Sequence, residues 1–423
     1  NLKDGIVKYN VSIQKKLSPF LLSINTNLEQ ISNDKLIKES DIDDITKYSL
    51  NTVFQWEPNQ LNTIKISNRF YQHLEDGESP LINTLTTIKR NNVSIDHSLD
   101  IKDNWIFNHI FQRQIYNRNY TETWNAGSES GTVETDDLTD EYLFEYEFTL
   151  NKKMDLNNFN VGMETSYSSY KSNRIGINKQ YIDAHSIFAQ YDVHILNDYN
   201  VIIGLRIDKY FDYQYVYSPR IGFMYSHDRH WKFRTSWGKG FRTPSFMERF
   251  IDYDHSATFG YKVIGNNDLK AEQSNGITAG IEYFHPTIYQ ASLMMYYTEF
   301  VNHIAEYYRG NQEYSYHNIN NTYTGLEIRG KWKASNKLSA TWEINLIDNR
   351  YSNGSLIPNT QPISVSNRFS YQSPKYPFGI STNMKWTGPY TPSSHDIETG
   401  TWVKEVKDRS GYIIFDISGN YTF

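Results

Sequence analysis

The chain ends in Tyr412-Ile-Ile-Phe-Asp-Ile-Ser-Gly-Asn-Tyr-Thr-Phe423, and this stretch decides the fold. Apolar or aromatic residues stand at every second position, and most residues between them are polar. A period of two is the signature of a β-strand with one apolar and one polar face. One face would carry Ile413, Phe415, Ile417, Gly419, Tyr421 and Phe423, and the other Asp416, Ser418, Asn420 and Thr422.

The same alternation recurs along the chain, at 142–148, 201–207, 326–332 and 338–346. These stretches predict strands of about nine to twelve residues, the length that crosses a bilayer at a tilt. A soluble β-sandwich also alternates, but its strands average about five or six residues. Because the apolar faces end in Tyr, Trp and Phe, as interfacial girdles do, the pattern favours an all-β fold, a transmembrane antiparallel β-barrel.

The predicted connections alternate between short and long, as in barrels with turns on one side of the membrane and loops on the other. The long links include 72–88, 117–139, 240–273 and 303–317. The pattern gives about 19 strands, whereas a closed antiparallel barrel needs an even number to leave no edge unpaired in lipid. Residues 1–423 are therefore predicted to be the C-terminal portion of a larger barrel that lacks about three upstream strands.

Composition excludes several classes of function. The 423 residues include 34 Tyr and no Cys, and the formal net charge is −6. The lack of Cys excludes disulfides and a Cys nucleophile, and the mild acidity argues against a nucleic-acid partner. No apolar run is long enough for a transmembrane helix. No nucleophile–base pair and no metal-ligand spacing is found, so neither an enzyme nor a resident metal is expected.

Two segments of the longest predicted loop carry a resemblance to a known family. Trp237-Gly-Lys-Gly-Phe-Arg-Thr-Pro-Ser-Phe-Met-Glu-Arg-Phe250 resembles the "GFRAPS…EL" segment of TonB-dependent outer-membrane receptors. Gly265-Asn-Asn-Asp-Leu-Lys-Ala-Glu272 resembles their "GNPDLKPE" segment, with Asn267 and Ala271 in place of the usual Pro. Asn321-Thr-Tyr-Thr-Gly-Leu-Glu327 is similar to the family's "N…Y.GLE" strand opening, and Phe423 matches its terminal aromatic signal.

The resemblance implies a barrel of about 22 strands in the bacterial outer membrane, with a plug domain that lies outside these residues. It implies active import of a scarce metal chelate (haem, a ferric siderophore or cobalamin) with energy from TonB-ExbB-ExbD through the missing N-terminal part. The chelate would be a transported ligand, so no cofactor is expected. Outer-membrane lipids are the other expected partner, with a surface lipoprotein as an optional one. A passive porin-like pore, or a structural platform for a surface lipoprotein complex, is the alternative.

The candidate ligand-binding residues come from two long outer links. His255 lies between the two motifs, where haem receptors of the family often carry an axial His; the other interpretation is a solvent-exposed loop His. The set predicted to line the outer mouth is Phe241, Arg242, Tyr253, His255, His303, Tyr308, Tyr314 and His317. Tyr supplies apolar area and a hydroxyl, which suits a flat chelate, but it would equally pack against lipopolysaccharide or a neighbouring loop.

The alternation also assigns charged residues to the barrel interior. Arg206, Arg234, Glu327 and Arg329 are predicted to face the lumen, together with Glu343 and Asp416. Leu338, Trp342 and Ile344 are predicted to face lipid. The inward charges would contact the plug or simply hydrate a wet wall.

Overall fold

The computed structural model of the chain describes residues 5–32, 44–79, 82–125, 127, 130–176, 179–196, 198–256, 260–396, 401–404 and 409–421. The chain divides into two compact units. The first unit comprises Asn1–Ala189, Arg206–Val216 and Phe250–Asp252. The second comprises Gln190–Leu205, Tyr217–Arg249 and Tyr253–Phe423.

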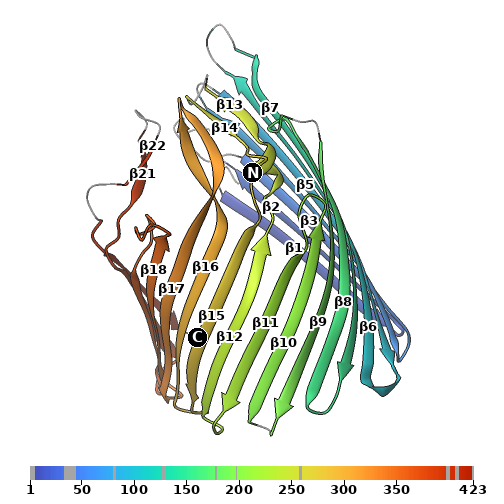
Figure 1. The fold of residues 1–423 in the computed structure, drawn as a ribbon, viewed down its shortest axis with the longest axis vertical. Helices are drawn as coiled ribbons and strands as arrows, with labels where there is room; N and C mark the ends of the chain where they lie inside the picture. Colours follow the sequence, from blue (N-terminus) through green and yellow to red (C-terminus); the bar gives the residue numbers. More distant parts are fainter. Residues whose placement is uncertain are drawn as a thin grey trace. The chain divides into compact units, whose positions relative to one another are not determined.

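The first unit is built on an antiparallel ladder in which each strand pairs with the next along the chain (Figure 1). Its strands are β1 (Gly5–Leu17), β2 (Phe20–Ser32), β3 (Asp44–Asn59), β4 (Asn62–Glu78), β5 (Ile82–Ile101), β6 (Trp105–Trp124), β7 (Val133–Lys153) and β8 (Asn157–Ser172). A 3-10 turn, η1 (Lys102–Asn104), joins β5 to β6. Next along the chain come β9 (Gln180–Ile195) and β10 (Tyr199–Tyr210), which contribute residues to both units.

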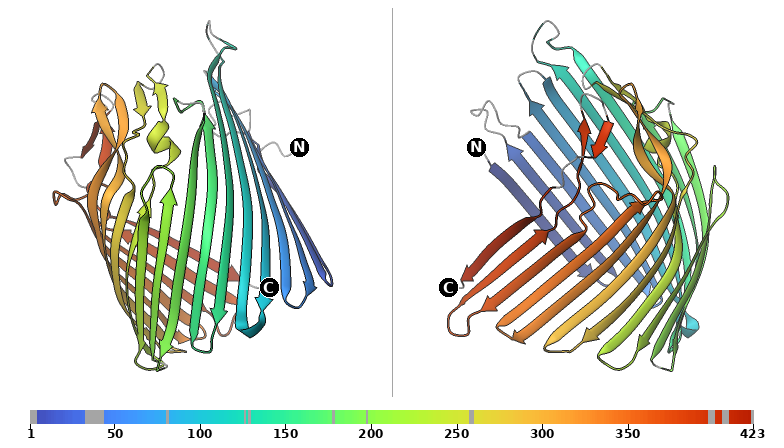
Figure 2. Two further views of the ribbon diagram at one scale, coloured as in Figure 1. Left: turned by 45° about the vertical axis from the view of Figure 1, so that its right-hand side comes forward. Right: turned by 60° about the vertical axis from the view of Figure 1, so that its left-hand side comes forward.

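The second unit contains another antiparallel ladder, in which β12 pairs with β15 across an inserted segment. In ladder order the strands are β11 (Val216–Ser226), β12 (Trp231–Arg242), β15 (Glu272–Phe284), β16 (Tyr289–Gly310), β17 (Glu313–Ser335), β18 (Leu338–Tyr351), β19 (Ile363–Gln372), β20 (Phe378–Thr387) and β23 (Tyr412–Tyr421). The insertion holds α1 (Phe246–Phe250), β13 (Asp252–His255) and β14 (Tyr261–Ile264), of which Phe250–Asp252 belong to the first unit. A separate two-stranded sheet pairs β21 (Ser393–Asp396) with β22 (Thr401–Lys404). Figure 2 gives two further views of these ladders.

The strand count confirms the sequence prediction. In the described part of the chain, nineteen strands have ten residues or more, and the other four have four residues each. The fold is therefore all-β, as predicted. No helix among the described residues is long and apolar enough to span a membrane.

Three of the predicted long links are wrong, because the strands continue into them. The link 303–317 is instead a hairpin formed by β16 and β17, which end and begin at Gly310 and Glu313. Likewise β6 and β7 extend into 117–139, and β4 and β5 extend into 72–88. Strand lengths consequently reach 23 residues, beyond the nine to twelve predicted. These extensions lack the apolar alternation, and they are held as strands by backbone hydrogen bonds to the neighbouring strand. The period-two pattern in the sequence therefore ends before the strand does.

Register confirms the division of the second ladder into two faces. On one face Phe233, Ile281, Leu293, Ile328 and Ile344 lie opposite one another on successive strands. On the other face Arg329 lies opposite Glu343, and Asn383 lies opposite Asp416. We call these the apolar face and the polar face. Which of them faces lipid and which the lumen stays a prediction.

Aromatic residues bound the apolar face at two levels. Trp231 lies opposite Tyr283 at one level, and Trp237 lies opposite Ile277, which pairs with Tyr297, at the other. Trp342 covers Gly330, where a Cβ would lie only 2.0 Å from the indole Cε2, so the ring occupies the space that glycine leaves. Aromatic rows of this kind are typical of the two edges of a membrane-spanning wall.

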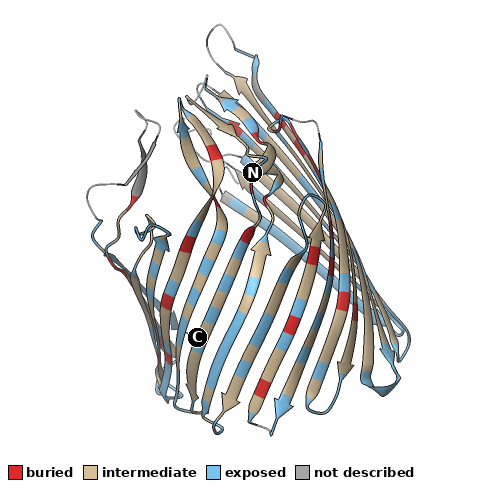
Figure 3. Cartoon of the chain, in the orientation of Figure 1, coloured by how far each residue is buried: buried red, intermediate tan, exposed pale blue. Residues whose placement is uncertain are grey.

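Few described residues are buried, and large apolar side chains are exposed (Figure 3). Ile413 and Ile417 of β23 are 64% and 68% exposed, and Met295 of β16 is 54% exposed. An apolar surface of this extent is rare in water-soluble monomers and marks contact with lipid or another protein. The fold is held by its hydrogen-bonded ladders rather than by an enclosed apolar core.

Candidate ligand-binding site

The first motif forms a sharp turn between β12 and α1. Arg242 ends β12, and the fully buried Pro244 precedes Ser245, the residue before α1. The Ser245 Oγ accepts a hydrogen bond from the Glu248 backbone N–H at 3.2 Å, while Glu248 Oε2 accepts from the Ser245 N–H at 2.7 Å. This reciprocal pair is a capping box, which satisfies two backbone donors that a helix start leaves unpaired. It fixes Glu248 beneath Arg242.

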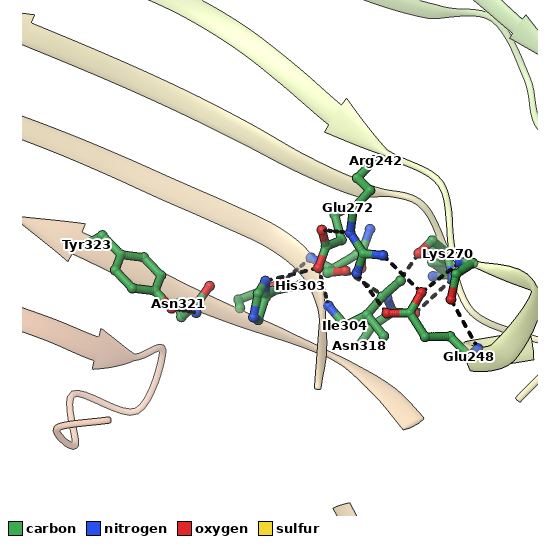
Figure 4. Close-up of polar contacts among 12 residues, drawn as sticks. Arg242, Glu248, Lys270, Glu272, His303, Ile304, Asn318, Asn321 and Tyr323 are labelled. Carbon is green, nitrogen blue, oxygen red and sulfur yellow. Dashed lines mark hydrogen bonds and ion pairs between the residues drawn. The ribbon is translucent and has the colours of Figure 1, made fainter. Parts of the chain in front are cut away.

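Arg242 is the centre of a charged network (Figure 4). Its Nη1 and Nη2 each donate to one oxygen of Glu248 at 2.9 Å, and its Nε donates to Glu272 Oε2 at 2.6 Å. Glu272 is buried and also accepts a hydrogen bond from the Ile304 N–H through Oε1 at 2.7 Å. The His303 Nδ1 lies 3.0 Å from the same Oε1. One carboxylate thus joins the start of β15 to the end of β12 and the upper part of β16.

Glu248 is ionised at neutral pH. Burial raises the pKa of this carboxyl, but the hydrogen bonds from Arg242 and from the Ser245 N–H and hydroxyl outweigh burial and lower the pKa below its ordinary value. A planar guanidinium that grips a carboxylate with two parallel hydrogen bonds fixes orientation as well as charge. The turn after β12 is therefore cross-linked by charged hydrogen bonds to Glu248 and Glu272.

The second motif docks on the hairpin of β16 and β17. The Asn266 Nδ2 donates to the Tyr316 carbonyl at 2.9 Å, and its N–H donates to the Glu248 carbonyl at 2.9 Å. Lys270 and Asn318 exchange hydrogen bonds of 2.8 and 3.0 Å. Upstream, β14 pairs in parallel with the start of β17. The insertion and the hairpin, which the sequence placed in two neighbouring outer links, therefore lie against each other.

Aromatic rings gather at the tip of this hairpin. The Tyr308 and Tyr314 ring centroids are 5.3 Å apart, and the Tyr261 ring of β14 meets Tyr314 edge-on at 6.0 Å. The Tyr308 hydroxyl accepts a hydrogen bond from the Gln312 N–H at 2.9 Å, and the Tyr307 ring packs edge-on against His317 at 4.4 Å. These rings provide amphipathic surface suited to a ligand with flat apolar and polar parts.

The structure brings together some predicted residues and leaves others apart. Arg242 and His303 meet at Glu272, and Tyr308 meets Tyr314. Tyr253 lies half-buried in β13, and Phe241 of β12 lies opposite Gln273. His255 ends β13, but its side chain lies outside the described residues, as does Phe423.

Each of the three arginines predicted to face the lumen pairs with at least one carboxylate. Arg206, in the first unit, contacts Glu164 at 3.1 Å and Asp208 at 2.8 Å. In the second unit Arg234 lies 3.0 Å from Glu282. Arg329 lies 3.0 Å from Glu327 and 3.3 Å from Glu343, which places all three on the polar face.

The sequence analysis did not identify Glu272 as the common partner of Arg242 and His303, although Glu272 is the last residue of the second motif. It also did not identify Asn266 and Asn318. Their side-chain amides take the place of backbone partners in an irregular segment by donating hydrogen bonds to backbone carbonyls. The S-x-x-E pattern of Ser245 and Glu248 is a readable helix-start signal. Nothing in the sequence pairs Asn318 with Lys270, 48 positions away. The described residues contain no group of three or more His, Cys, Asp or Glu placed to hold a metal ion.

Comparison with known families gives one match. The family model described as TonB dependent receptor-like, beta-barrel matches residues 36–423. A search of curated proteins finds no match.

Solved structures share the fold at low sequence identity. The siderophore receptor PirA from Pseudomonas aeruginosa is 14% identical with a TM-score of 0.73, and the alignment covers 100% of this chain and 72% of that one. PirA from Acinetobacter baumannii is 13% identical with a TM-score of 0.76 and the same coverage. The copper transporter OprC is 12% identical with a TM-score of 0.78, covering 99% and 70%.

Proposed function

The chain belongs to the TonB-dependent receptor β-barrel family, and from this premise we propose that it takes part in importing a scarce metal chelate across the outer membrane. Barrels of this family are outer-membrane proteins, and so is this chain. Receptors of the family work with TonB-ExbB-ExbD and bind small-molecule chelates. The proposal is that this chain does the same with haem, a ferric siderophore or cobalamin.

The observation that supports the proposal is the docking of the insertion on the β16–β17 hairpin. Arg242, Glu272 and His303 fix the base of the two segments, and aromatic rings lie at the hairpin tip. A preformed surface costs less to order on binding than a flexible loop does. We propose that Phe241, Arg242, Tyr253, His255, His303, Tyr308, Tyr314 and His317 belong to the ligand mouth.

The family and the similar solved structures are transport receptors rather than enzymes. Those comparisons do not favour the passive pore or the structural platform. The siderophore and copper named for the similar structures are ligands of those proteins. For this chain an iron chelate is the first ligand class to test.

Calorimetry of the full-length receptor with haem, a ferric siderophore and cobalamin tests the proposal. If haem binds through His255, replacing His255→Ala weakens binding and alters the Soret band, because an axial ligand is lost. If another chelate binds, the double change Tyr308→Ala and Tyr314→Ala weakens its binding, and His255→Ala does little. The control is Tyr376→Ala, a 55% exposed tyrosine in the short link between β19 and β20. Absence of binding to all three, with steady ion conductance in planar bilayers, would contradict import.

A further inference from the structure

The apolar face of the second unit contains a groove of about 480 Å³. It crosses β15, β16, β17 and β18, and its apolar lining is Ile277, Ala279, Met295, Tyr297, Leu326 and Leu346. Register places Ala279 opposite Met295, Met295 opposite Leu326, and Leu326 opposite Leu346. The groove therefore follows one row of residues across the ladder.

The side chains in that row explain why the groove exists. Ala279 is small, while its neighbours along β15 on the same face are Ile277 and Ile281. Met295 is 54% exposed, Ile277 49% and Leu346 38%, so the walls stand out from the sheet and are not packed under other chain segments. An apolar groove that the chain leaves open exposes its lining. An apolar ligand that fills the groove removes this surface from water or lipid headgroups, and the burial stabilises the bound state.

The groove lies at the upper edge of the apolar face. Ile277 and Tyr297, in its lining, belong to the aromatic row that includes Trp237. One row further on the same face, Lys239 lies opposite Asn275, and Asn275 lies opposite Glu299. Arg350 of β18 occupies the same level and pairs at 2.9 Å with Asp348, the one charged residue among the described residues that line the groove. Apolar side chains thus give way to charged ones within two residues, as at a bilayer–water boundary.

We propose that this groove binds one acyl chain of a phosphate-bearing outer-leaflet lipid, with Lys239 beside the phosphate. Because the protein lies in the outer membrane, an exposed apolar face meets lipid chains. Lys239 is exposed, and no ion-pair partner for it occurs among the described residues. Lys239 lies on β12, one strand beside the groove and one row beyond Ile277, and a cation there matches a lipid in which a phosphate follows an acyl chain. The site lies on the opposite face of the ladder from Arg329 and does not depend on which chelate is transported.

Native mass spectrometry of the full-length receptor extracted from outer membranes tests the proposal. The wild-type receptor retains one lipid at collision energies that strip the others. Ala279→Trp fills the groove and lowers the retained fraction about tenfold, the effect of withdrawing roughly two methylene groups from apolar contact. Lys239→Gln lowers retention severalfold without changing the amount of folded protein.

The matched control is Ala291→Trp, on the same face of β16, opposite Gly330 and Tyr283 and outside the groove. A Trp there joins an existing aromatic row and leaves retention unchanged. If Ala279→Trp fails to insert, Met295→Trp fills the same groove from the neighbouring strand. Equal retention by groove-filling and control variants overturns the proposal, and so does a retained species whose mass includes no phosphate.

Discussion

The strands of the second unit and the Arg242 network at their outer end are held by different forces. Along β15 to β18, residues of one class repeat at every second position, and many substitutions would preserve the pattern. At Arg242, two carboxylates and one imidazole meet at defined atoms, so the arrangement depends on the identity of each residue. A periodic wall tolerates change within a class of residue, whereas a partly buried ion network leaves a charge without its partner when one member is lost.

The largest loss of stability is expected when a charged residue replaces an apolar one on the apolar face. Ile344→Arg puts a charge in the middle of the apolar face and should lower the free energy of unfolding by about 2–4 kcal/mol, because a cation at mid-membrane depth loses its hydration. Ser366→Arg, on the polar face opposite Glu343, should change it far less. Urea unfolding in liposomes, followed by Trp fluorescence, measures both. Equal losses would show that the two faces do not differ in environment.

A smaller effect is expected when the network loses its shared carboxylate. Glu272→Gln removes the charge that Arg242 and His303 share, and should destabilise the docked insertion locally by roughly 1–3 kcal/mol, since buried donors lose a charged acceptor. Hydrogen exchange at 266–272 and 302–304 measures this opening. Glu282→Gln breaks the exposed 3.0 Å pair with Arg234 and is expected to cost only about 0–1 kcal/mol. Similar exchange in both variants would refute a special role for Glu272.

The capping box tests whether the network depends on its local helix. Ser245→Ala removes the hydroxyl that accepts from the Glu248 N–H and should destabilise α1 by about 0.5–2 kcal/mol. Ser245→Thr keeps the hydroxyl and should restore most of that loss. Exchange of the Glu248 amide reports the difference. An unchanged amide in the Ala variant would mean that Arg242 alone holds the turn.

The smallest effect is expected from pH. The folded-state pKa of Glu248 lies below its ordinary value of 4.5, so its contribution is complete above that value and is lost as pH falls through the lower folded pKa. Exchange in α1, corrected for intrinsic rates, should therefore rise on acidification below about pH 4.5. Glu248→Gln should lose most of this dependence. A pH profile identical in the wild type and the variant would assign the acid sensitivity to another group.

The sequence predicted the wall well because its physical cause is local. Ile328 and Glu327 are adjacent in the chain and lie on opposite faces of the ladder, as the period of two requires. Prediction failed at 303–317, where β16 and β17 continue as a paired hairpin. Polar strands outside a membrane need no apolar face, and nothing in their composition then distinguishes them from a loop.

The sequence by itself determined the class of fold, the number of long strands and the two motif segments, since each rests on neighbours within a few residues. Only the tertiary structure decided that Glu272 is the partner of both Arg242 and His303, and that Asn318 closes on Lys270. Only the structure located the groove beside Ala279, because residues of four strands together form that groove. The physical reason is that these contacts depend on register between strands, and register is fixed by the whole ladder rather than by any one strand.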